Sequence, residues 1–173
     1  MNIKVFSLGL IQLTLAILVG VLVLWFTFKI IKVLVSRKME IKADNIAFAI
    51  FSGAILLSVG LIMSESISPA MNAYRIGIQD SQSIQLTALA FVKVLLGYLS
   101  IGLLTAMIIN LVSIWLYNLL TKDVDELTEI RNGNIATAII TAVIIISITL
   151  MAKDSLGIIF ESFIPYPDTP KFY

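Results

Sequence analysis

Two acidic residues, Glu65 and Asp154, are the side chains best suited to do chemistry, because each follows a long apolar stretch. A carboxylate in the interior of a membrane can hold a cation or pass on a proton. The alternative is a solvated helix end, at which Lys153 partly compensates Asp154. Neither acid has a second carboxylate one helical turn away, so an acidic pair requires the two segments to meet in the fold.

Two asparagines, Asn45 and Asn134, each precede an apolar stretch that is long enough to form a helix. Asparagine is a favoured N-cap, because its side-chain oxygen accepts a hydrogen bond from the free amides of the first helical turn. Those amides are costly to leave unpaired near lipid. We therefore expect helix capping, and the alternative is a polar gate or a contact with a partner.

Small residues recur four positions apart after both asparagines: Ala49 with Gly53, and Ala138 with Ala142. This spacing places both members of a pair on one helix face and lets two helix backbones approach closely. We expect these two helices to pack against each other through the small-residue faces. The alternative is a pore lined by these residues together with the hydroxyl groups of Ser52, Ser58, Thr141 and Ser147.

Three polar residues lie inside apolar stretches. Asn110 and Thr105 share one stretch, and Gln12 lies in the first. We expect them to form hydrogen bonds between helices, each of which contributes roughly 1 kcal/mol or less in a membrane.

Several kinds of chemistry are excluded by composition. The sequence contains no Cys and no His, which excludes disulfides, thiol nucleophiles, iron–sulfur clusters, Cys/His zinc sites and a histidine base. It also lacks the glycine motifs that bind phosphates and dinucleotides. The net charge of +1 gives no sign of nucleic-acid binding. We expect no catalysis, cofactor or metal ion.

The overall composition predicts a membrane protein. Of the 173 residues, 59% are hydrophobic and only 13% are charged, and the mean hydropathy is +1.02. A soluble domain is roughly half apolar and about a quarter charged. Lipid must therefore be the solvent for much of the chain, and a helix pairs its own backbone groups there. We predict an all-α integral membrane fold.

Four stretches are long and apolar enough to cross a bilayer, which takes about 20 residues. They lie at about residues 5–28, 46–63, 94–117 and 135–152. The first is read as a retained anchor rather than a cleaved signal peptide, because its apolar part is long and basic residues follow it. Lysines and arginines concentrate between the first two spans, which places that linker in the cytoplasm and both termini outside.

An internal repeat relates residues 39–66 to residues 128–155 at an offset of 89. Polar residues match at this offset, including the two asparagines and the two acidic residues. Each copy holds two spans, so both copies enter the membrane in the same orientation. The predicted units are repeat 1 (1–68), an outer linker (69–92), repeat 2 (93–155) and an interfacial tail (156–173).

The tail carries one apolar helix face, formed by Leu156, Ile159, Phe160 and Phe163. The spacing predicts a short amphipathic helix on the outer surface of the membrane. Three prolines follow and end any helix. The alternative for the last residues is a terminus without fixed structure.

These motifs resemble the YjfL-like bacterial inner-membrane proteins, a family known as domain of unknown function 350. The likeness lies in residues 44–49 (DNIAFA) and 133–138 (GNIATA), with support from 51–54 (FSGA) and 64–66 (SES). It covers roughly residues 5–154. Ala142 stands where the first copy has Gly53, which departs from a glycine-rich pattern. The resemblance implies an accessory subunit of the bacterial inner membrane, associated with membrane-stress proteins.

The sequence and the resemblance together predict a subunit that scaffolds an envelope or membrane-stress complex. The expected partners are the lipid bilayer, further copies of the chain, and other membrane or envelope proteins, and no nucleic acid is expected. The alternative is a small oligomeric ion channel or transporter, in which Glu65 and Asp154 would line the path. An enzyme acting on lipid is the third hypothesis, and it would require a polar pocket that faces the bilayer.

Overall fold

The computed structural model describes residues 3–36, 44–77, 84–120 and 126–164 of the chain. Every regular element within these ranges is an α-helix. The helices are α1 (Ile3–Ser36), α2 (Ile46–Gly77), α3 (Ile84–Leu120), α4 (Glu126–Arg131) and α5 (Ile135–Ser162). The prediction of an all-α fold is confirmed.

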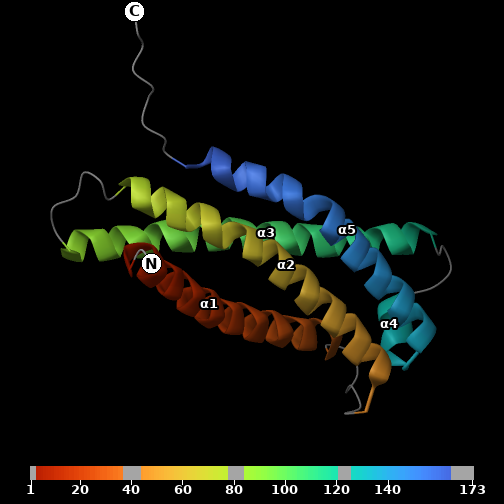
Figure 1. The fold of residues 1–173 in the computed structure, drawn as a ribbon. Helices are drawn as coiled ribbons and strands as arrows, with labels where there is room; N and C mark the ends of the chain where they lie inside the picture. Colours follow the sequence, from red (N-terminus) through yellow and green to blue (C-terminus); the bar gives the residue numbers. More distant parts are fainter. Residues whose placement is uncertain (1–2, 37–43, 78–83, 121–125, 165–173) are drawn as a thin grey trace, which may run out of the picture.

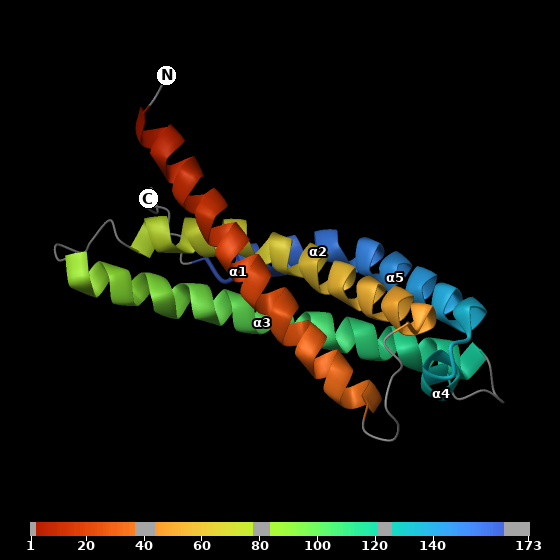
Figure 2. The same cartoon turned by 90° about the horizontal axis from the view of Figure 1, so that it is seen from below.

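Helix α2 lies at the centre of the bundle, and its contacts with α5 and α3 are the most extensive in the structure. Helices α2 and α5 run in the same direction from the end at which α4 lies, and α3 runs beside them in the opposite direction (Figure 1). Helix α1 packs on α2 and crosses the bundle steeply, so its N-terminal part projects away from the other helices (Figure 2).

Four helices are long and apolar enough to cross a membrane. The candidate spans are Leu13–Val33, Ile46–Ala73, Val92–Leu119 and Ile135–Ser162. Large apolar side chains cover the outside of the bundle, and Trp25 and Trp115 are both 62% exposed. Such a surface suits lipid rather than water. The chain is therefore a multi-pass membrane protein with four spans, as predicted.

Helix α2 is longer than the predicted second span. It continues through Pro69 instead of ending near Met63, and most of the linker predicted at 69–92 is helical. The polar residues 64–66 follow directly after the predicted end. In the fold Ser66 is buried, and its hydroxyl donates to the Met63 carbonyl at 2.7 Å. Because the helix itself pairs this polar group, the run does not end it.

Helix α5 likewise continues beyond residue 152. Residues 156–162 belong to it and do not form the separate interfacial helix predicted there. Leu156 and Phe160 are buried, and the Phe160 ring lies 6.1 Å from that of Tyr98 on α3. Packing against the bundle, rather than a membrane surface, accounts for these apolar residues. The rest of the predicted tail, from residue 165, lies outside the described residues, and the two-repeat organisation stays a prediction.

Candidate functional site

Both predicted capping asparagines lie at the end of the bundle that α4 occupies. Asn45 Oδ1 accepts a hydrogen bond from the Phe48 amide at 2.8 Å, and Asn134 Oδ1 accepts one from the Thr137 amide at 3.2 Å. Each side chain pairs an amide that would otherwise lack a partner in the first turn of its helix. This geometry favours a capping role over a polar gate.

Asn45 also connects two helices that are distant in the sequence. Its Nδ2 atom donates to the carbonyls of Ile130 and Arg131 at 3.1 and 2.9 Å. These carbonyls belong to the last turn of α4, where a helix cannot pair all of its own carbonyls; that of Ile130 also accepts from the Gly133 amide. One side chain therefore satisfies the start of α2 and the end of α4 together.

The turn from α4 into α5 depends on Gly133, whose φ of +87° is a left-handed conformation that glycine adopts at little cost. The Gly133 amide donates to the Ile130 carbonyl, and Asn134 Nδ2 donates to the Glu129 carboxylate at 2.9 Å. Helix α4 was not predicted. The apolar spacing of Leu127 and Ile130 ahead of a glycine is the signal that could have found it.

The small-residue faces do not meet as predicted. Ala138 and Ala142 are buried on α5, but Ala49 and Gly53 lie on the exposed side of α2. A methyl group added at Gly53 would meet no described atom within 4 Å. The predicted face is therefore wrong for α2, although α2 and α5 do pack together. Larger residues fill the buried face of α2, among them Phe51, which is 2% exposed.

Two other glycines lie where α3 and α5 approach α2 closely. A methyl group added at Gly102 of α3 would lie 3.1 Å from the sulfur atom of Met63. One added at Gly157 of α5 would lie 3.4 Å from the Glu65 carboxylate. Close approach therefore depends on glycines that the sequence analysis did not single out.

A chain of hydrogen bonds crosses the middle of the bundle, and we call Asn110, Ser58 and Thr149 the polar relay. The Thr149 hydroxyl donates to the Ile145 carbonyl at 2.7 Å. Its one hydrogen is thereby used, so Ser58 is the donor in the 2.7 Å contact between the Ser58 and Thr149 hydroxyls. Asn110 Nδ2 donates to Ser58 at 3.1 Å and to the Ala106 carbonyl at 2.8 Å. The relay runs in one direction from α3 through α2 to α5.

All three residues of the polar relay are buried: Ser58 and Thr149 are 0% exposed and Asn110 is 6% exposed. Hydrogen bonds in such surroundings polarise one another and fix the positions of the groups they join. Asn110 thus forms the predicted interhelical hydrogen bond. Thr105 instead donates to the Ile101 carbonyl of its own helix at 2.8 Å.

The four hydroxyl groups considered as a pore lining have separate roles. Ser52 and Thr141 are buried and donate to carbonyls of their own helices at 2.7 and 2.8 Å. Ser58 belongs to the polar relay, and Ser147 is exposed on the outside of α5. Three hydroxyls are therefore engaged inside the bundle, and the fourth lies on its exterior.

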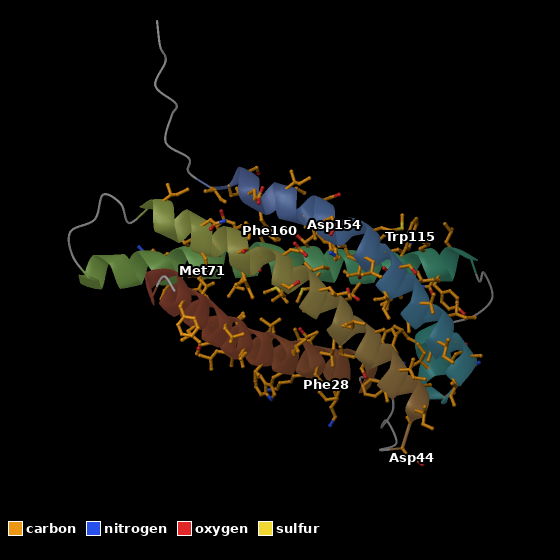
Figure 3. All side chains as sticks on the ribbon, in the orientation of Figure 1. Phe28, Asp44, Met71, Trp115, Asp154 and Phe160 are labelled. Atoms are coloured by element: carbon orange, nitrogen blue, oxygen red, sulfur yellow. The ribbon has the colours of Figure 1, made fainter. Side chains whose placement is uncertain are left out.

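Glu65, Lys153 and Asp154 form an ion group between α2 and α5. Lys153 Nζ lies 3.7 Å from Glu65 Oε1 and 2.6 Å from Asp154 Oδ1. The side chains of Glu65 and Lys153 are 31% and 27% exposed, whereas that of Asp154 is 80% exposed on the outer side of α5 (Figure 3). The two segments therefore meet, as an acidic pair requires, but a lysine ammonium group lies beside both carboxylates.

Comparison with known proteins identifies one family. The family model described as Domain of Unknown Function (DUF350) matches residues 5–156, which is most of the chain. No curated protein and no solved structure matches the chain.

Proposed function

The chain belongs to the DUF350 family, and from that premise we propose that it is a structural subunit of a larger membrane assembly. In this role it performs no reaction and holds other membrane or envelope proteins, or further copies of itself, in place. We also propose that it resides in the bacterial inner membrane with both termini outside. The basic residues between its first two spans support this orientation.

The use of the polar side chains within the spans carries the proposal. An ion path needs polar groups that face water or the passing ion. In this bundle the polar relay consumes its hydroxyl and amide hydrogens internally, and Glu65 lies beside Lys153. Groups paired in this way stabilise one fixed arrangement of helices, which suits a protein that acts through its shape.

Helix α1 is the element best placed to contact a partner. In its most apolar stretch it buries 11% of its residues, against 50% for the corresponding stretch of α2. Leu18 of this helix is 60% exposed. Helices in membranes associate through close packing of such surfaces.

A channel or transporter is the second candidate, and the ion group is the observation that favours it. Glu65 and Lys153 lie within candidate spans and are both about one-third exposed. Charged groups at such positions are rare and often mark the path of an ion or a proton. In that case Lys153 would release Glu65 when the ion arrives.

Reconstitution of the purified full-length chain in liposomes separates the two candidates. For a structural subunit, we expect leakage of protons and potassium equal to that of protein-free vesicles. A flux that Glu65→Ala abolishes would overturn the proposal, provided that the control Ser100→Ala, which leaves the ion group intact, does not change it. Ser100 is exposed and bonds within its own helix.

The assembly itself is tested by extracting the tagged chain from its native membrane and measuring the mass of the particle. We expect a fixed stoichiometry larger than one chain. Leu18→Trp should reduce the assembled fraction at least fivefold, whereas Met151→Trp, at an 82% exposed position on α5, should leave it unchanged. A particle that contains a single chain in both cases contradicts the structural role.

A further inference from the structure

A cavity of about 200 Å³ lies between α1, α2 and α3, in the part of the bundle that the candidate spans cover. Eight of its ten lining residues are apolar, including Ile30, Val59 and Leu111. Leu111 is 67% exposed, so the cavity opens at the surface beside α3. That surface belongs to a candidate span, and the opening therefore faces lipid.

The two polar residues of the cavity, Thr27 and Asn110, each carry an oxygen without a hydrogen-bond partner in the described residues. They are 7% and 6% exposed. Thr14, Thr105 and Thr149 each donate to the carbonyl four residues earlier, whereas the Thr27 hydroxyl has no such bond in the described residues. A buried polar group without a partner is costly in lipid, where water is scarce.

The orientation of the Asn110 amide follows from its neighbours. Its nitrogen contacts the Ala106 carbonyl, which can only accept a hydrogen bond. The other end of the amide is therefore the oxygen, which accepts. Thr27 Oγ1 can donate as well as accept. A single hydroxyl group could accept from Thr27 and donate to Asn110, and so satisfy both.

We propose that this cavity binds an alcohol with an apolar body, whose hydroxyl group bridges Thr27 Oγ1 and Asn110 Oδ1. The apolar lining excludes a charged head group, and one water molecule, which needs only about 10 to 15 Å³ of such space, would leave most of the volume empty. The hydroxyl would donate to the first residue of the polar relay and so join the ligand to α2 and α5. Both oxygens are covered while the cavity is empty. Binding is therefore expected to turn Thr27 by one rotamer, which exchanges its hydroxyl and methyl groups, and to shift Asn110 enough to uncover its Oδ1.

This site does not depend on the proposed structural role. The ligand would hold α1, the least buried of the four spanning helices, against α2 and α3. Its source is the bilayer, because the cavity opens there, and long-chain or isoprenoid alcohols have the required chemistry.

The test uses the purified full-length chain in lipid nanodiscs and a long-chain alcohol that carries a photoreactive diazirine. The methyl ether of the same compound is the matched probe, because it cannot donate a hydrogen bond. Labelling is mapped by mass spectrometry and expressed as the ratio of the peptide containing Leu111 to the peptide containing Met151, which marks the lipid-facing surface. We expect the alcohol to give a ratio about fivefold higher than the ether, as the loss of one hydrogen bond implies.

Thr27→Val keeps the shape of the side chain and removes a hydroxyl that has no partner in the described residues, so the variant should fold. It should lower the alcohol ratio to that of the ether. Ser113→Ala is the control, because Ser113 is buried on α3 and donates to the Ile109 carbonyl; it should leave the ratio unchanged. Equal labelling by the alcohol and the ether, no enrichment at the Leu111 peptide, or an unchanged ratio in Thr27→Val would each overturn the proposal.

Discussion

Disruption of the polar relay should destabilise the bundle by an amount that its geometry sets. In a Ser58→Ala variant, the Asn110 amide loses one acceptor and the Thr149 hydroxyl loses its donor. Hydrogen bonds between membrane helices contribute about 0.6 kcal/mol on average and about 1.7 kcal/mol at most. Two such bonds predict a loss of roughly 1 to 3 kcal/mol in the free energy of unfolding.

A double-mutant cycle isolates one bond of the relay. Thr149→Val keeps the shape of the residue and removes the hydroxyl that Ser58 contacts at 2.7 Å. Because both side chains are 0% exposed, we expect a coupling energy between Ser58→Ala and Thr149→Val of about 0.6 to 1.7 kcal/mol.

The assay is reversible unfolding of the purified chain in mixed micelles, in which the fraction of denaturing detergent is raised and helicity is followed by circular dichroism. Ser100→Ala is the control, because its hydroxyl bonds only to the Leu96 carbonyl of its own helix and is exposed. This variant should change the unfolding free energy by less than about 0.5 kcal/mol. A coupling energy near zero, or equal effects of Ser58→Ala and Ser100→Ala, would refute the reasoning.

Three further predictions use the same unfolding assay. Asn45→Ala removes a cap and two bonds to α4 and should lower the free energy of unfolding by about 1 to 2 kcal/mol. A loss no larger than that of the surface control Ser100→Ala would contradict the dual role. Gly102→Val should destabilise by about 1 to 3 kcal/mol through overpacking, whereas Gly53→Ala should be neutral or stabilise by up to about 1 kcal/mol; the reverse order would show that the close contacts are misplaced. Lys153→Met leaves Glu65 without its cation and should lower the unfolding free energy, and adding Glu65→Gln should restore at least half of the loss; no restoration would mean that the pair is not coupled.

The sequence predicts best what depends on local physics. Four spans follow from the length of the apolar stretches, and the capping positions of Asn45 and Asn134 follow from the residue type and its place ahead of a helix. The hydrogen bond from Asn110 to another helix follows from the cost of an unpaired amide in lipid. Each of these conclusions needs only one stretch of the chain.

The faces of the helices could not be predicted in the same way. In a soluble helix the apolar residues mark the buried side, but here the lipid-facing and buried sides of α2 are both apolar. Small residues were the remaining guide, and at Ala49 and Gly53 they indicate the wrong side. The packing of Gly102 and Gly157 against α2 depends on the helix register, which no local pattern in the sequence specifies.

The continuation of α2 and α5 beyond their apolar runs was also missed, for a physical reason. A polar residue was read as a helix end because it was assumed to need water. Ser66 instead bonds to its own helix, and Glu65 lies beside a lysine of α5. The partner of a polar group can lie far away in the sequence, so a composition rule ends the span too early.

The double role of Asn45 has a consequence for the order of events during synthesis. The carbonyls to which it donates lie 85 and 86 residues further along the chain, and the acceptor of Ser58 lies 91 residues further. At about 5 to 20 residues per second, α2 leaves the ribosome several seconds before these partners exist. During that interval α2 holds polar groups whose permanent partners have not been translated, so its packing in the bundle is completed only when the last helix arrives.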